Sequence, residues 1–254
     1  MKTKIHLNKI FNYPEIKFAA LQGKGGLGTK VDREFTAAFS LFLKKNSILC
    51  IDIGGNKGAY TEQILKKLPN CSVIIFEPQQ SNVAILREKF KHNGNVILEQ
   101  LAISNKNDNA ILYSDKDGSG LASLTKRKLK HFGKNFLNTE NIKTIKFEDY
   151  WKEKLNSKNI DFCKLDIEGH EMDALVGMGT AINYIDLIQF EFGGCNIDTR
   201  IFFQDFWYFF KEKEFDLFRI SPLGTIPIIN YKESDECFAE TNYLAKKKLN
   251  ILNL

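Results

Sequence analysis

The sequence predicts an α/β protein whose mostly parallel, seven-stranded sheet carries helices on both faces and includes an antiparallel closing strand. Three observations predict this class. Short apolar runs alternate with amphipathic helical stretches between residues 48 and 192, which is typical of a parallel sheet covered by helices. Two later apolar runs follow one another without a long helix between them, which favours antiparallel pairing. Hydrophobic residues make up 43% of the 254 residues, so one large domain can bury a core.

A helix is predicted before the sheet, because Asp32 can cap a stretch with apolar residues at helical spacing. These apolar residues are Phe35, Ala38, Phe39, Phe42 and Leu43. The strands that follow are predicted at 47–52, 73–77, 96–103, 161–166, 185–192, 215–220 and 238–245. The helices between them are predicted at 59–68, 81–92, 168–178 and 199–213. Pro69 and Gly94 follow the first two of these helices, where residues of this kind end a helix.

The chain is expected to form a single domain, because no internal repeat or low-complexity linker divides it. An N-terminal loop and helix precede the sheet, and the core carries an insertion between its third and fourth strands. A C-terminal helix and the closing strands complete the domain. These parts are expected at 1–46, at 47–192 with the insertion at 108–146, and at 193–254.

The net charge comes from one short stretch. The chain has 36 basic and 31 acidic residues, a formal charge of +5. Five of the basic residues lie in the acid-free stretch Lys126 to Lys134, so the rest of the chain has 31 of each sign. A charge excess confined to one loop argues against a nucleic-acid partner, which needs a broad basic surface.

No membrane span or secretory signal is expected. The longest uninterrupted apolar run is five residues, Phe206 to Phe210, whereas a bilayer-spanning helix needs roughly 20. The basic N-terminal stretch lacks the apolar segment of a signal peptide. The five cysteines are odd in number and scattered, and three lie in apolar runs, so they are read as reduced packing residues. We therefore expect a cytoplasmic protein.

Two glycine-rich loops compete as nucleotide-type sites. The first, Gly23 to Gly28, spells Gly-x-Gly-x-x-Gly but continues with Thr29 and then Lys30. A phosphate loop needs the lysine directly after the last glycine and a hydroxyl residue after that. The preceding residues 16–21 read as a weak strand, and no acidic strand end follows at the usual distance. We therefore favour a flexible loop that folds over a neighbouring site.

The second loop lies between a clear strand and a clear helix and contains Asp52, Gly54, Gly55, Asn56 and Gly58. A carboxylate at Asp52 would repel a pyrophosphate but would attract an ammonium or sulfonium ligand. Glu77 ends the next strand, where an acid can accept both hydroxyls of a ribose. S-adenosylmethionine fits this combination, NAD fits it less well and ATP poorly. The alternative is an ordinary strand–helix turn beside an acidic strand end.

Three motifs together resemble the FkbM family of S-adenosylmethionine-dependent methyltransferases, over roughly residues 48–192. They are Asp52 to Thr61, Phe76 to Pro78, and Lys164 to Glu171. The third, with its Asp-Ile-Glu-Gly-His-Glu run, is the most specific. The resemblance implies a Rossmann-like class I methyltransferase fold and methylation of a hydroxyl on a sugar, glycan or secondary metabolite. The implied cofactor-binding residues are Asp52, Gly54, Gly55, Asn56, Gly58, Thr61 and Glu77; the family commonly has Ala at Gly55.

The catalytic candidates are Asp166, Glu168 and His170, because methyl transfer from a sulfonium requires an aligned, partly deprotonated nucleophile. Asp166 ends a strand at the ligand-binding edge of the sheet, and His170 can accept a hydroxyl proton near neutral pH. Glu168 can orient the substrate or cap a helix. Alternatively, His170 only bonds a neighbouring loop. A metal ion on these three residues is a further alternative, but three ligands within five residues make a thin case, so no metal is expected.

Other residues near the predicted site have two readings each. Glu191 ends a strand at the same edge, where it can bind a substrate hydroxyl or remain a solvated strand end. The aromatic helix Phe202 to Phe210 reads chiefly as core, with one ring as a candidate for the acceptor pocket. The resemblance places the insertion over the active-site mouth. The stretch Lys126 to Lys134 is then either a solvated loop or a site for an acidic or phosphorylated acceptor.

Other functions remain open at this point. A catalytically silent binding protein would keep the fold without turnover, and an NAD-dependent sugar oxidoreductase is opposed by Asp52. Methylation of nucleic acid bases is disfavoured by the neutral remainder of the chain. The element Asn/Asp-Pro-Pro-Tyr/Phe, which enzymes that methylate base amino groups use, does not occur in the sequence.

Overall fold

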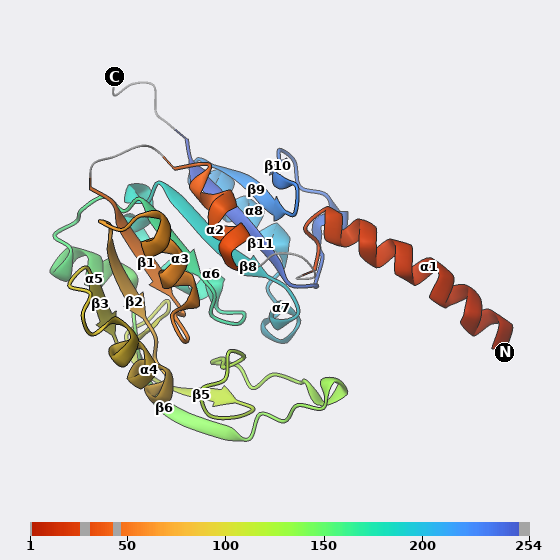
Figure 1. The fold of residues 1–254 in the computed structure, drawn as a ribbon, viewed down its shortest axis with the longest axis horizontal. Helices are drawn as coiled ribbons and strands as arrows, with labels where there is room; N and C mark the ends of the chain where they lie inside the picture. Colours follow the sequence, from red (N-terminus) through yellow and green to blue (C-terminus); the bar gives the residue numbers. More distant parts are fainter. Residues whose placement is uncertain (1, 26–30, 43–46, 249–254) are drawn as a thin grey trace.

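The computed structural model describes residues 2–25, 31–42 and 47–248, without the side chains of residues 2–11. Its main sheet has the order β10-β9-β11-β8-β7-β1-β2-β3 (Figure 1). The strands are β1 Leu49–Ile53, β2 Ser72–Phe76, β3 Val96–Glu99, β7 Phe162–Leu165, β8 Leu187–Phe192, β9 Phe215–Ser221, β10 Gly224–Ile228 and β11 Thr241–Lys247. The predicted α/β class is confirmed.

Most of the sheet is parallel, as predicted. Strands β3, β2, β1, β7 and β8 pair in parallel, whereas β11 pairs antiparallel with both β8 and β9. The sheet has eight strands instead of the predicted seven, because β10 folds back onto β9 as a hairpin. Gly224 has a φ of +114° at this turn, a conformation that glycine adopts without a steric penalty.

Helices cover both faces of the sheet. Successive strand residues point to opposite faces, so Ile51 and Cys163 join one buried cluster while Cys50 and Phe162 join the other. The first cluster packs under α5 (Phe147–Lys154), α6 (Glu171–Gly177) and α8 (Phe203–Glu212). The second packs under α2 (Val31–Phe39), α3 (Ala59–Lys67) and α4 (Gln80–Phe90). Burial on both faces explains why the central strands are continuously apolar.

The insertion is a small sheet of its own, which the sequence analysis did not predict. Its strands β4 (Ala102–Ile103), β5 (Asp108–Ser114) and β6 (Asn138–Ile145) have the order β4-β6-β5. The predicted strand 96–103 is therefore split: β3 stays in the main sheet, and β4 pairs with β6. The β5–β6 ribbon lies below the main sheet, and its long connecting loop reaches toward α7 (Cys195–Thr199) (Figure 1).

The N-terminal expectations were partly wrong. Helix α1 (Lys2–Leu21) occupies the predicted loop and includes the predicted weak strand 16–21. It projects from the body of the molecule (Figure 1). Its end is fixed by Arg219, whose Nε donates to the carbonyl oxygen of Gln22 at 2.7 Å. Asp32 lies in the first turn of α2 rather than at its cap, and Leu43 lies outside the described residues.

Three further helix predictions need correction. The predicted helix 199–213 is two helices, α7 and α8, because Arg200 adopts a left-handed φ of +63° between them. Helix α6 begins at Glu171 rather than at Glu168, for reasons given below. Helix α5 was not predicted. Within the described ranges, no helix combines the length and apolar character needed to cross a membrane.

The first glycine-rich loop lies partly outside the described residues, since Gly26 to Gly28 are among those the structure leaves out. Its described part packs against strand β9. Gly23 has a φ of +76°, and a Cβ there would lie 2.0 Å from the carbonyl oxygen of Ile220. A side chain at position 23 would therefore clash with the backbone of β9, which explains the glycine there.

Candidate active site

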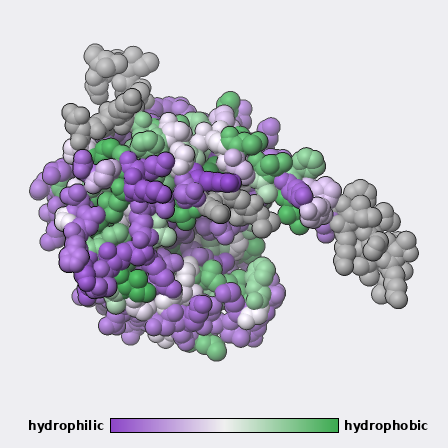
Figure 2. Space-filling model, in the orientation of Figure 1, coloured by the Kyte–Doolittle hydropathy of each residue, from purple (hydrophilic) through white to green (hydrophobic). Residues whose placement is uncertain are grey.

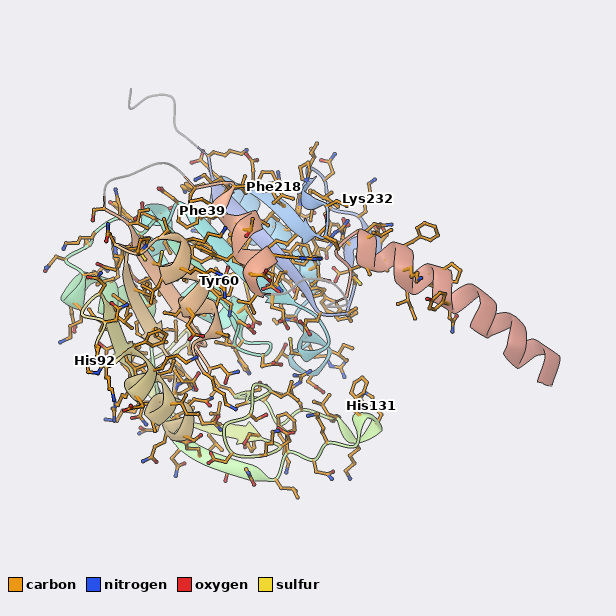
Figure 3. All side chains as sticks on the ribbon, viewed as in Figure 1. Phe39, Tyr60, His92, His131, Phe218 and Lys232 are labelled. Carbon is orange, nitrogen blue, oxygen red and sulfur yellow. The ribbon has the colours of Figure 1, made fainter. Side chains whose placement is uncertain are left out.

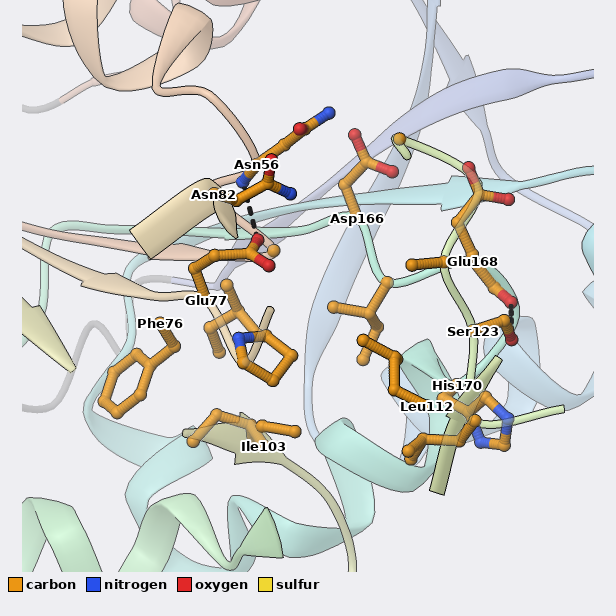
Figure 4. Close-up of a pocket in the computed structure, with 18 of the residues that line it drawn as sticks. Asn56, Phe76, Glu77, Asn82, Ile103, Leu112, Ser123, Asp166, Glu168 and His170 are labelled. Carbon is orange, nitrogen blue, oxygen red and sulfur yellow. Dashed lines mark hydrogen bonds between the residues drawn. The ribbon is translucent and has the colours of Figure 1, made fainter. Parts of the chain in front are cut away.

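The candidate site is a small cavity where the carboxyl ends of β1, β2 and β7 meet. Its volume is about 60 Å³. Asn56 and Glu77 line one side, and Asp166, Glu168 and His170 line the other (Figure 4). Residues 119–124 of the insertion supply part of the remaining wall. Ligand pockets usually enclose about 300–1,000 Å³, so this cavity is smaller than a usual nucleoside site.

Asp52 lies behind the cavity, fully buried at the end of β1. The Thr61 hydroxyl donates to its Oδ2 at 2.6 Å, while its Oδ1 has no hydrogen-bond partner within the described part of the chain. Burial raises the pKa of Asp52, and the nearby Lys164 ammonium opposes this shift. A buried carboxylate oxygen without a donor is costly unless a ligand or water supplies one.

The loop after β1 requires glycine because the backbone passes very close to its neighbours. Gly54 has a φ of +85°, and a Cβ there would lie 2.0 Å from the carbonyl oxygen of Asp166. A Cβ at Gly55 would lie 2.2 Å from Cγ2 of Ile75. Gly54 lines the cavity, whereas Gly55, Gly58 and Thr61 do not. Cofactor contact by these four residues stays a prediction.

Glu77 is fixed by backbone donors from two directions. Its Oε2 accepts the N–H of Asn56 at 2.8 Å, and its Oε1 accepts the N–H of Gln79 at 2.9 Å. Burial raises the pKa of Glu77 to about 7, although these two hydrogen bonds lower it. A side-chain hydrogen bond from Asn82 also lowers this pKa, so about one of the four acceptor sites of the carboxylate is left for a further donor. Glu77 is therefore a fixed, poised acceptor beside the glycine-rich loop (Figure 4).

The loop after β7 is stabilised by an acid that sequence analysis did not single out. The buried carboxylate of Glu171 accepts the N–H of Ile167 at 2.8 Å and that of Gly169 at 3.0 Å. Glu168 and Gly169 have positive φ values of 56° and 101°, which no helix accommodates. These contacts explain why α6 begins only at Glu171.

Glu168 joins the core to the insertion. Its carboxylate forms an ion pair with Arg127, and its carbonyl oxygen accepts the Ser123 hydroxyl at 2.8 Å. Burial raises the pKa of Glu168 to about 8, with a further increase from the Asp166 charge, while Arg127 opposes both. Arg127 also lies 3.7 Å from Asp198. Arg127, one of the five basic residues in the stretch Lys126 to Lys134 (the basic patch), therefore pairs with acids inside the protein.

His170 is hydrogen-bonded at both ring nitrogens. Its Nδ1 lies 2.8 Å from Oδ2 of Asp173, and its Nε2 lies 3.0 Å from the Thr125 hydroxyl. A carboxylate only accepts, so we assign the proton to Nδ1, which leaves Nε2 as an acceptor for Thr125. The contact with a neighbouring loop is therefore present, and the role of His170 as a base stays a prediction. Among the described residues, no three His, Cys, Asp or Glu side chains are arranged to bind a metal ion.

A row of buried polar side chains crosses the sheet beneath the site, and the sequence analysis did not predict it. Lys164 faces Asp52 on β1 and Gln189 on β8 in the strand register. Its Nζ lies 2.9 Å from Oδ2 of Asp166 and 4.8 Å from the centre of the Tyr60 ring, and Tyr60 donates to Gln189. Burial lowers the pKa of Lys164, but the Asp166 and Asp52 charges outweigh it and the net shift is upward. Lys164 and Gln189 stand inside otherwise apolar strands, and this pattern in the sequence could have indicated the buried row.

The remaining candidates fall outside the cavity. Glu191 lies near the same edge, where burial and the charge of Asp166 raise its pKa well above the usual range. On the aromatic helix, Phe203, Phe206 and Phe210 are fully buried, which confirms the core reading for these rings. The cysteines are unpaired thiols, as predicted.

Comparison with known proteins gives one family and several distant relatives. Residues 52–219 match the methyltransferase FkbM domain. The 2-O-methyltransferase NoeI of Sinorhizobium fredii (strain NBRC 101917 / NGR234) is 25% identical over 157 residues, which span 58% of this chain and 63% of NoeI. The chain therefore covers somewhat less than two thirds of the length of this relative.

Two solved structures resemble the chain at low identity. The methyltransferase FkbM from Methylobacillus flagellatus KT has a TM-score of 0.49 at 14% identity, with 80% of this chain and 45% of that one covered. The fibrillarin pre-rRNA processing protein of Methanococcus jannaschii has a TM-score of 0.47 at 9% identity, with 86% and 76% covered. The family match over residues 52–219 is the informative one, because it spans more than half of the chain and contains every residue that lines the site. This protein belongs to the methyltransferase FkbM family.

Proposed function

We propose that the protein is an S-adenosylmethionine-dependent O-methyltransferase that methylates a hydroxyl of a sugar, glycan or secondary metabolite. One observation carries the proposal. The cavity has on one side Glu77, an acid suited to bind ribose hydroxyls, and on the other Asp166, Glu168 and His170, which are suited to orient and deprotonate an acceptor hydroxyl. Membership of the FkbM family supports methyl transfer. The name of the relative NoeI, a 2-O-methyltransferase, supports an oxygen as the methyl acceptor.

The cofactor would be bound by the loop from Asp52 to Thr61 together with Glu77. When bound, S-adenosylmethionine supplies a methyl group on a positively charged sulfur. The unpartnered Oδ1 of Asp52 suits a cationic ligand, and the remaining acceptor site of Glu77 suits a ribose hydroxyl. A pyrophosphate-containing cofactor fits less well, since Asp52 and Glu77 would repel it.

His170 is the proposed base. Its Nδ1–H donates to Asp173, which fixes the tautomer and leaves Nε2 to accept the proton of the acceptor hydroxyl. The Thr125 hydroxyl now occupies Nε2, so the acceptor hydroxyl takes its place when it binds. Asp166, fixed by Lys164, orients that hydroxyl, and Glu168, fixed by Arg127, shapes the wall next to it.

The proposal is tested first by calorimetric titration of the full chain with S-adenosylmethionine. We expect binding by the natural protein, loss of binding in Asp52→Ala and weaker binding in Glu77→Gln. Glu88→Gln serves as the control, because Glu88 is an exposed acid of α4 that forms an ion pair with Lys91. Absence of binding by the natural protein would refute the proposal.

A second experiment separates an enzyme from a silent binding protein. Glycans and small polyols are incubated with the protein and cofactor, and mass spectrometry looks for the addition of one CH₂ group. Product formation that is lost in His170→Gln supports the proposed chemistry. Cofactor binding without product across the panel would instead favour a binding protein, and NAD in the purified protein would favour an oxidoreductase. The proposed location is the cytoplasm, a reducing compartment that suits the five unpaired thiols.

A further inference from the structure

We propose that the acceptor is an anionic carbohydrate whose acidic group binds in a second cavity beside the methyl-transfer site. This inference rests on the proposed function and specifies its substrate class. The second cavity has a volume of about 460 Å³ and lies between residues 125–132 of the insertion and residues 194–200, which include α7. Figure 3 shows His131 at the tip of the insertion loop, on the side that faces α7.

The second cavity is strongly basic. Its lining contains four permanent cations, Lys126, Arg127, Lys128 and Arg200, and one carboxylate, that of Asp198. Arg127 and Asp198 lie 3.7 Å apart, and Arg127 also pairs with Glu168. The Arg127 side chain is only 8% exposed, so its charge serves these internal contacts and not a ligand. The charges available to a ligand are therefore those of the other three residues.

These three cations are exposed, and no ion pair within the described part of the chain involves them. The two remaining basic residues of the patch differ. Lys134 pairs with Asp115 at 3.1 Å, whereas Lys130 is exposed and lines an adjoining cavity that Lys126 and Lys128 line as well. The predicted basic patch is thus divided into structural and available charges, and Arg200, from outside the patch, joins the available group.

The second cavity adjoins the proposed methyl-transfer site. Thr125 lines the second cavity and bonds Nε2 of His170, which lines the first. Arg127 lines the second cavity and pairs with Glu168, which also lines the first. The contacting pairs Thr125–His170 and Arg127–Glu168 therefore form part of the wall between the two cavities. An acceptor whose hydroxyl displaces Thr125 therefore extends directly into the second cavity.

The charges of the two cavities are opposite, which fixes the orientation of the acceptor. Three acids, Glu77, Asp166 and Glu168, line the methyl-transfer site, whereas Lys126, Lys128 and Arg200 line only the second of the two cavities. An anionic group is repelled at the methyl-transfer site and attracted to Lys126, Lys128 and Arg200. A neutral acceptor would gain nothing from this arrangement.

Apolar side chains in the second cavity favour a ring rather than a bare ion. Phe132 is 71% exposed and Ile197 is 49% exposed, and Phe238 joins them in the lining. In Figure 2 the lower lobe of the molecule presents hydrophobic and hydrophilic side chains next to each other. Ligand sites combine apolar walls with a few placed polar groups. Cations beside exposed rings suit a sugar that bears a phosphate or a carboxylate.

The test replaces the three available cations and compares anionic with neutral sugars. The variant is Lys126→Gln, Lys128→Gln and Arg200→Asn, since asparagine tolerates the left-handed backbone at position 200. The control, Lys116→Gln, Lys143→Gln and Lys146→Gln, removes the same charge from exposed positions of the insertion and its end. Saturation-transfer NMR measures the dissociation constants of glucose 1-phosphate, glucuronic acid and glucose with each full-length protein.

We expect the natural protein and the control to bind at least one anionic sugar at least tenfold more tightly than glucose. The triple variant should lose this preference, and the phosphate and carboxylate arms identify the preferred anion. Equal binding of anionic and neutral sugars by the natural protein, or an unchanged preference in the triple variant, would overturn the proposal. Calorimetry with S-adenosylmethionine is run in parallel. Its failure would refute methyl transfer while leaving the anion result to be judged separately.

Discussion

The ionisation of Glu77 gives a quantitative prediction for cofactor binding. Burial raises the pKa of Glu77 to about 7, above the usual value for a glutamate, so the side chain is protonated below that pH and ionised above it. Both of its oxygens already accept backbone N–H groups. The Asn82 side chain donates to Glu77 as well. A ribose hydroxyl needs the remaining acceptor site of the ionised form, so binding favours the carboxylate.

The magnitude follows from the fraction of Glu77 that is ionised. With a pKa of about 7, roughly a tenth of the molecules are ionised at pH 6 and roughly nine tenths at pH 8. An apparent dissociation constant is the intrinsic constant divided by the competent fraction. The dissociation constant for S-adenosylmethionine should therefore be about tenfold larger at pH 6 than at pH 8, with protons released on binding near pH 7.

Isothermal titration calorimetry across pH 6 to 8 measures this dependence, and two buffers of different ionisation enthalpy count the released protons. In Glu77→Gln the amide must place its NH₂ against the N–H of Asn56 or of Gln79, which leaves a donor unpaired at a cost of about 1–3 kcal/mol. That variant should bind weakly and without the pH dependence, while the exposed control Glu88→Gln should keep it. A flat dissociation constant in the natural protein, or the same slope in Glu77→Gln, would refute the reasoning.

Three other predictions concern the remaining walls of the site. Thr125→Val should keep or raise kcat, because the Thr125 hydroxyl competes with the acceptor for Nε2 of His170. His170→Gln should lower kcat about 10²–10⁴-fold. A large loss of kcat in Thr125→Val would instead make Thr125 part of the proton path. Gly54→Ala should abolish cofactor binding in calorimetry, since its Cβ would lie 2.0 Å from a backbone oxygen; unchanged affinity would contradict the packing argument. Glu171→Gln should lower the unfolding free energy by about 1–3 kcal/mol, because an N–H of the loop loses its acceptor. Chemical denaturation measures it, with the exposed Glu212→Gln as a control expected within about 0.5 kcal/mol of the natural protein.

The sequence was most informative where burial on two faces forced continuous apolar runs. Asp52 is the second-last residue of β1, and Asp166 directly follows β7, because a carboxylate marks the end of an apolar run at the sheet edge. Glu77 follows β2 for the same reason. Parallel pairing of these strands then brings their ends together, so the composition of the candidate site could be predicted without any contact information.

Long-range contacts account for most of what was missed. The start of α6 depends on Glu171, whose side chain turns back to bind backbone N–H groups of the preceding loop, a contact that local propensity does not encode. Arg127 reads as one more surface charge until Glu168 and Asp198 are seen beside it. The β5–β6 ribbon was missed because its strands alternate exposed with buried residues, and one face alone gives a weak signal.

The insertion contributes consecutive residues to both cavities, and this continuity bears on the order of substrate addition. Residues 119–124 wall the small cavity, and residues 125–132 form one side of the larger one. Cofactor binding that shifts residues 119–124 would therefore also shift the side chains that would bind an acceptor. Steady-state kinetics should follow a compulsory order, with the cofactor first, and the demethylated cofactor should inhibit competitively against S-adenosylmethionine but not against the acceptor.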